Sequence, residues 1–211
     1  MDNDVILKLA ATQLLEDWEK QVAKPGHEIR VIVSAKHFFR KKSDLPLKYG
    51  AAAIPVAIAF AARAKIVSDA TNPKEFELLN RLAGIDSGEA ALFSAAVGLP
   101  DYLVVSGDKI GMRALEQGAG CGDIRRRLKG RVIAFEQVFL ALLERGNFAG
   151  IREQVVTAER VDKVLQVAFG LGLETTLEKA TEAMEYYIAA LRKQTGDLLI
   201  TSEKLSDLLG D

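Results

Sequence analysis

The sequence has few of the residues that build disulfide frameworks and soft-metal sites. Among 211 residues, Cys121 is the one cysteine, and His27 and His37 are the two histidines. A single cysteine excludes an intrachain disulfide and a cysteine-based zinc site, and it is typical of proteins from a reducing compartment. Two histidines also argue against a histidine-rich metal centre.

An excess of charge of either sign is absent too. The chain carries 28 lysines and arginines against 29 aspartates and glutamates, which gives a formal net charge of −1. The whole molecule therefore has no electrostatic attraction to nucleic acid or to a membrane surface, and any contact with RNA must come from a local patch.

No apolar run is long enough to span a bilayer. The most apolar stretch, Gly50–Ala62, is shorter than the roughly 20 residues that a membrane helix needs, and Pro55 interrupts it. We expect a buried core helix there. Asp2 and Asp4 stand where a secretory leader would have basic residues, so we expect a cytoplasmic protein that has no contact with membranes.

The most informative stretch is Gly84–Lys109, which reads as helix, strand and helix start. Glu89 falls in the first turn of the first helix, where the helix dipole favours an anion, and Gly98–Pro100 ends that helix. The apolar run Tyr102–Val105 predicts a short buried strand. Asp108 follows this strand and precedes the next helix.

Acidic residues at such positions can build a site for a hard cation. Ligands bind beyond the carboxyl ends of parallel strands, where Asp108 is expected, and Glu89 could converge on the same edge. Asp2 and Asp4 precede an amphipathic helix and repeat this pattern. The alternative is structural: Glu89 complements a helix dipole, Asp108 is an N-cap, and the first residues are merely polar.

A dense basic segment lies farther along the chain. It is the best candidate for contacts with RNA phosphates, although a solvated helix end is an equal alternative. Its cations are Arg125, Arg126, Arg127, Lys129 and Arg131.

Alternating strands and helices up to about residue 147 predict an α/β protein with a parallel sheet. Further strands are expected at Glu28–Ser34 and Arg131–Ala134, and only helices thereafter. We therefore divide the chain into an α/β domain, residues 1–147, and a helical C-terminal extension, residues 148–211. The apolar strip Tyr186–Leu191 should pack on the chain's own core, on a second copy or on a protein partner.

Three short motifs, in this order and spacing, resemble PIN-domain nucleases over about residues 1–145. They are Asp2-x-Asp4-Val5, Gly88-Glu89-Ala90 and Ser106-Gly107-Asp108-Lys109. The resemblance implies a three-layer parallel sheet flanked by helices and a metal-dependent ribonuclease acting on RNA. It further implies that Asp2, Glu89 and Asp108 are catalytic. The implied ligands of Mg²⁺ or Mn²⁺ are Asp2, Asp4, Glu89 and Asp108.

Two alternatives remain open. PIN nucleases usually carry another acid after the second strand, and this chain has none between Glu28 and Asp44, which favours an inactive binding or assembly module. The third hypothesis is a phosphatase of the haloacid-dehalogenase type, suggested by Asp2-x-Asp4. That family would have different residues at Ile6 and Met112, so this hypothesis ranks last.

Overall fold

The computed structural model describes residues 1–67, 72–158 and 161–210, and most of these are helical. The helices before the middle of the chain are α1 (Asn3–Ala11), α2 (Leu15–Val22), α3 (Ala35–Lys41), α4 (Leu45–Tyr49), α5 (Ala53–Arg63), α6 (Pro73–Asn80) and α7 (Ser87–Gly98). The later ones are α8 (Lys109–Gln117), α9 (Gly122–Leu128), α10 (Phe135–Arg145), α11 (Phe148–Thr157), α12 (Lys163–Ala168), the 3₁₀ turn η1 (Gly172–Glu174), α13 (Leu177–Thr195) and α14 (Ser202–Leu209).

The strands are few and short. They are β1 (Arg30–Val31), β2 (Lys65–Ile66), β3 (Val104–Ser106) and β4 (Val132–Ala134). Within the described residues they form two separate parallel pairs, β1 with β2 and β3 with β4. The expected three-layer PIN-like α/β fold with one parallel sheet is therefore wrong, because fourteen helices dominate this part of the chain and each sheet has only two strands.

Local geometry explains the shorter strands. The run Glu28–Ser34 pairs only at Arg30 and Val31, since its partner β2 is equally short. The next residues turn into α3, and the amide of Ala35 donates to the carbonyl of Ile32 at 3.0 Å. At the start of the chain, Asp2 is the N-cap of α1 and does not end a strand.

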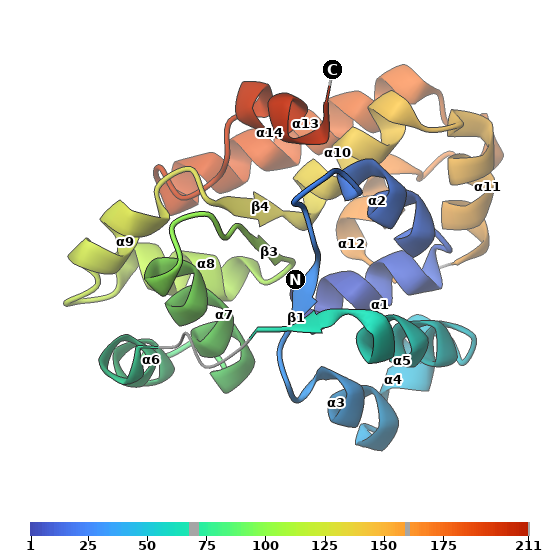
Figure 1. Ribbon diagram of the computed structural model, residues 1–211. Helices are drawn as coiled ribbons and strands as arrows, with labels where there is room; N and C mark the ends of the chain where they lie inside the picture. Colours follow the sequence, from blue (N-terminus) through green and yellow to red (C-terminus); the bar gives the residue numbers. More distant parts are fainter. Residues whose placement is uncertain (68–71, 159–160, 211) are drawn as a thin grey trace.

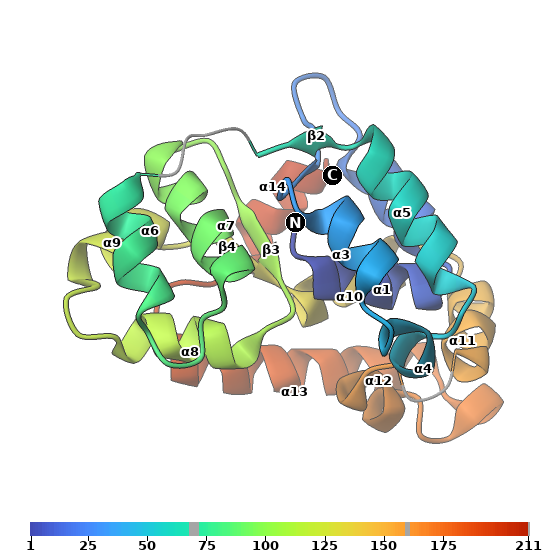
Figure 2. The same cartoon turned by 90° about the horizontal axis from the view of Figure 1, so that it is seen from below.

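The first two residues connect the two sheets. The amino nitrogen of Met1 donates to the carbonyl of Arg30 at 2.6 Å, and the amide of Asp2 donates to the carbonyl of Val105 at 2.8 Å. In both ribbon views the N-terminus lies centrally, between the segments that carry the sheets (Figure 1, Figure 2). These hydrogen bonds hold Asp2 beside the last residues of β3.

The core is made mainly by helices that are apolar on most sides. The side chains of Val5, Ile6 and Leu9 in α1 are fully buried, and so is Ala90 in α7. The expectation of a buried helix over residues 50–62 is only partly met. The helix α5 begins at Ala53, and although Phe60 is buried, Val56 is 45% exposed.

The helices after residue 147 pack on the rest of the chain. The long helix α13 lies against α10 and α8 (Figure 2), and it buries Ile188 and Leu191 while Tyr186 stays 71% exposed. One departure from a wholly helical extension is a single parallel bridge between Leu199 and Val132. No helix in the described ranges has the length and apolar character needed to cross a membrane.

Candidate acidic site

Three of the acids singled out in the sequence come together at helix starts. Asp2 is the N-cap of α1, Glu89 is in the first turn of α7, and Asp108 is the N-cap of α8. The charges of Asp108, Asp2 and Asp86 all act on the carboxyl of Glu89 and raise its pKa. The structure thus brings Asp2, Glu89 and Asp108 into one acidic cluster, and adds Asp86.

Glu89 is the buried member of the cluster, with 4% of its surface exposed. It forms a capping box with Asp86: the amide of Asp86 donates to Oε2 of Glu89 at 3.1 Å, and the amide of Glu89 donates to Oδ1 of Asp86 at 2.8 Å. The other oxygen, Oε1, is buried and has no hydrogen-bond partner among the described residues. Burial, and then the neighbouring carboxylates, raise the pKa of Glu89 to about 9.

The carboxylate of Glu89 lies against the first turn of α8. A Cβ atom added to Gly111 would lie 2.6 Å from Oε1 of Glu89, so only glycine leaves room for it. In the same turn, Oδ1 of Asp108 accepts the amides of Ile110 at 2.7 Å and Gly111 at 3.2 Å. Asp108 is therefore an N-cap, as the structural alternative held, and also a neighbour of Glu89.

Asp2 is partly buried at the start of α1. Burial raises its pKa to about 6, and the charge of Asp4 adds to this effect. Two groups of the cluster, Asp2 and Glu89, thus have raised pKa values, first because they are buried and second because other carboxylates lie nearby.

Asp4 differs from Asp2 and Glu89, because two lysines lie beside its carboxylate. Its Oδ2 lies 2.7 Å from Nζ of Lys8, and its Oδ1 accepts a short hydrogen bond from the hydroxyl of Tyr49 and lies 3.4 Å from Nζ of Lys48. Burial alone would raise the pKa of Asp4, but these partners outweigh it and lower the pKa. To bind a metal, Asp4 would have to leave three partners.

Lys8 and Asp162 were missed in the sequence. Nζ of Lys8 lies 2.7 Å from Oδ2 of Asp162 and 4.8 Å from the ring centre of Phe135, and the residue is 7% exposed. Burial would lower the pKa of Lys8, but Asp4 and Asp162 outweigh it and raise the pKa. The spacing of Asp4 and Lys8 on one helix face was a usable signal. Nothing local pointed to Asp162.

The lysine next to Asp108 in the sequence points to a different acid. Nζ of Lys109 lies 2.5 Å from Oε1 of Glu136, which follows β4 and is 1% exposed. Lys109 therefore neutralises Glu136. The hydroxyl of Ser106, also buried, accepts the amide of Asp108 at 3.1 Å and helps to hold this turn.

The basic segment largely serves the structure of the chain. The guanidinium of Arg131 donates to the carbonyls of Ala96 at 2.7 Å and Tyr102 at 2.5 Å. Arg125 donates to the carbonyl of Gly118, and the other three cations form ion pairs: Arg126 with Asp123, Arg127 with Glu75 and Lys129 with Asp197. Contact of these residues with RNA stays a prediction.

The fit of a metal ion can be judged from the donors. The side-chain atoms of the cluster that could bind a metal ion are all carboxylate oxygens, the ligand type that Mg²⁺ and Mn²⁺ prefer. Among them, Oε1 of Glu89 is buried and has no hydrogen-bond partner among the described residues. As the side chains stand, however, no group of three or more histidine, cysteine or acidic residues in the described part of the chain is arranged to hold a metal ion. The donor chemistry fits a hard cation, and the carboxylates would have to turn to enclose it.

Comparisons with protein families, with curated proteins and with solved structures gave no match for this chain. The functional argument therefore rests on the residues themselves.

Proposed function

We propose that the chain is a divalent-metal-dependent ribonuclease whose Asp2, Glu89 and Asp108 hold Mg²⁺ or Mn²⁺. The observation that carries the proposal is the carboxyl group of Glu89. One of its oxygens is buried and lacks a partner among the described residues, and burial, followed by the charges of three other carboxylates, raises its pKa to about 9.

The electrostatics favour a cation over the empty cluster. With a pKa of about 9, Glu89 holds a proton at neutral pH, because its burial, and then the charges of Asp108 and Asp2, make ionisation costly. A divalent ion would remove this cost and displace the proton. When bound, such an ion lowers the pKa of a water molecule and stabilises charge that develops on a phosphate.

The chain's own residues have separate parts in this proposal. The amides at the start of α8 orient Asp108, and the capping box orients Glu89. Asp4, which the sequence suggested as a metal ligand, is not part of the proposed metal site, because it forms an ion pair with Lys8 and a hydrogen bond with Tyr49. Cations of the basic segment would contact RNA phosphates, and the single cysteine fits a cytoplasmic location.

Cleavage of RNA tests the activity. Purified protein should cut single-stranded RNA in the presence of Mn²⁺ and not after its removal with a chelator. Asp108→Asn should lower the rate by at least 100-fold if the removed charge stabilises the transition state. Asp44→Asn is the matched control, since Asp44 is exposed at the start of α4 and makes no side-chain cap bond. Cleavage by wild type and Asp108→Asn at equal rates would exclude this site.

Metal binding can be measured without RNA. Mn²⁺ at about 100 times its dissociation constant should stabilise the fold by about 2.7 kcal/mol. This corresponds to a rise of roughly 5–10 °C in melting temperature for a chain of this size. Asp108→Asn should weaken the response, whereas Asp4→Asn should lower the melting temperature without Mn²⁺ and keep the response. If wild type does not respond to Mn²⁺ and cuts no RNA, a binding or assembly module becomes the better interpretation.

A further inference from the structure

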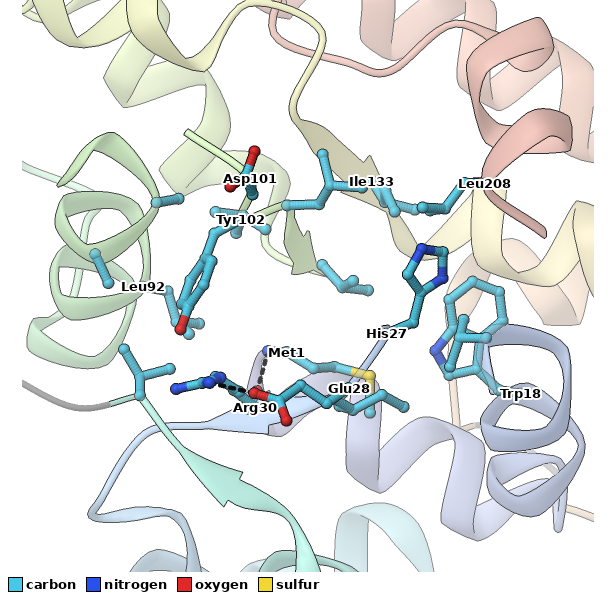
Figure 3. A pocket seen from close by; sticks show the side chains of 18 of the residues that line it. Met1, Trp18, His27, Glu28, Arg30, Leu92, Asp101, Tyr102, Ile133 and Leu208 are labelled. Atoms are coloured by element: carbon cyan, nitrogen blue, oxygen red, sulfur yellow. Dashed lines mark hydrogen bonds and ion pairs between the residues drawn. The ribbon is translucent and has the colours of Figure 1, made fainter. Parts of the chain in front are cut away.

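A pocket that none of the acidic-cluster residues line begins beside Met1. It is a pocket of about 370 Å³ at the amino ends of β1 and β3, where Arg30 and Tyr102 lie (Figure 3). Asp108, in contrast, follows the carboxyl end of β3. Tyr102 of the pocket and Asp108 of the acidic cluster thus lie beyond opposite ends of β3.

The walls of the pocket are mostly apolar. Its lining includes Leu92 and Ala96 of α7, Leu103, Ile133 of β4 and Leu208 of α14. Its volume falls at the lower end of the range for small-molecule sites, which are concave, mainly apolar and carry a few polar groups. The pocket can therefore enclose a compact apolar body.

Aromatic groups face the hollow from two sides. Tyr102 and His27 stand on opposite sides of it, with Trp18 beside His27 (Figure 3). The guanidinium of Arg30 lies 5.2 Å from the ring centre of Tyr102. Flat rings on opposite walls favour a flat aromatic ligand, because aromatic groups gain from stacked or edge-to-face contact beyond the area they bury.

The charges around the pocket balance. Glu28 forms ion pairs with Arg30 and with Lys65, and Asp101 is the remaining charged residue of the lining. Asp101 is exposed to solvent, and the amino group of Met1 donates to the carbonyl of Arg30, so among the described residues no buried charge without a partner lines the pocket. A charged ligand would lose hydration without gaining a counterion, so an uncharged one is favoured.

We propose that this pocket binds an uncharged planar aromatic molecule of one or two rings. Two sources share this chemistry, a free aromatic compound and the base of a nucleotide. The inference stands apart from the ribonuclease proposal, because it depends on none of the residues of the acidic cluster.

The single tryptophan provides a direct test. Trp18 lines the pocket and is the one tryptophan of the chain, so protein labelled with ¹⁵N gives one indole N–H signal in a proton–nitrogen NMR spectrum. Unlabelled indole as the probe should shift this signal in a saturable way, and calorimetry should give a matching dissociation constant. Adenosine distinguishes the sources: saturable binding of adenosine as well identifies a base, and binding of indole alone identifies a free compound.

Two variants test the part that the aromatic side chains have in binding. His27→Ala and Tyr102→Leu should each weaken indole binding about 3- to 10-fold. The matched controls His37→Ala and Tyr186→Leu alter exposed residues outside the pocket and should leave binding unchanged.

Tryptamine and indole-3-acetate, which carry a positive and a negative charge, should bind several-fold more weakly than indole. Equal affinity of all three probes, or no saturable shift of Trp18 with indole and adenosine, would overturn the proposal. Asp108→Asn should bind indole like wild type, which separates failure of this site from failure of the metal site.

Discussion

Nζ of Lys8 lies 2.7 Å from Oδ2 of Asp162, and this ion pair joins the first helix of the chain to the start of α12. The same ammonium lies 2.7 Å from Asp4. Oδ1 of Asp162 also accepts the amides of Val164 and Leu165 and so begins α12. One buried cation therefore connects two distant segments and neutralises Asp4.

Removal of this cation should be costly. Lys8→Met would remove the cation that Asp162 pairs with and leave Asp4 with only the exposed Lys48, and breaking a buried pair in this way typically costs about 3–5 kcal/mol. Lys20→Met is the control, because Lys20 pairs with Glu16 on the surface and such pairs contribute about 0–1 kcal/mol. Urea denaturation of both variants measures the difference.

A triple variant checks the cause. Asp4→Asn and Asp162→Asn, added to Lys8→Met, remove the two negative charges that Lys8 neutralised and should recover part of the lost stability. If Lys8→Met unfolds no more easily than Lys20→Met, the buried ion pairs do not have the role assigned to them.

The raised pKa of Glu89 predicts how stability depends on pH. Its value is about 9 in the folded chain against 4.5 for the free group, so the folded state binds the extra proton between these two pH values. The stability that this proton contributes is present in full below pH 4.5 and is lost as the pH rises through about 9. Glu89→Gln cannot ionise, so it should become more stable relative to wild type as the pH rises.

Chemical denaturation at pH 5, 7 and 9, without divalent ions, measures this trend. Glu182→Gln on the exposed surface of α13 controls for the loss of one negative charge. A constant difference in unfolding free energy between wild type and Glu89→Gln at all three pH values would contradict the assigned shift.

The close approach of Glu89 to α8 predicts the effect of a methyl group at Gly111. Alanine normally stabilises a helix interior relative to glycine by about 1 kcal/mol. At Gly111, however, the added Cβ would lie 2.6 Å from Oε1 of Glu89, so overpacking should make Gly111→Ala less stable by about 1–3 kcal/mol.

Gly122→Ala in α9 is the matched control, because the nearest atom to its added Cβ lies 3.9 Å away, on the flexible side chain of Arg125. Thermal unfolding should show no loss there. Gly111→Ala in a Glu89→Ala background should recover most of its cost. A stabilising effect of Gly111→Ala alone would mean that the carboxylate of Glu89 does not lie against this turn.

Local signals predicted helix limits well. The sequence predicted a helix with Glu89 in its first turn that ends at Gly98–Pro100, and α7 runs over Ser87–Gly98 with Glu89 in its first turn. Capping residues, glycine and proline act within a few residues along the chain, so their effect can be read without knowledge of the fold.

The lengths of the strands could not be predicted from local signals. The alternating apolar residues of Glu28–Ser34 predicted a strand, but a strand is only as long as its pairing with a partner, and β2 pairs with only two of these residues. The fold class inferred from alternating strands and helices was wrong for the same reason. Propensity marks where a strand can begin, whereas hydrogen bonds to distant residues decide its length and the extent of its sheet.

By itself, the sequence determined the limits of α7 and the places of Glu89 and Asp108 at helix starts, because these depend on neighbours within one or two turns. Only the tertiary structure decided which acids meet. It places Asp108 and Asp2 near enough to Glu89 for their charges to raise its pKa. It also forms the ion pairs of Lys8 with Asp4 and with Asp162. Charges act over distances in space, and residues far apart in the sequence become neighbours only when the chain packs.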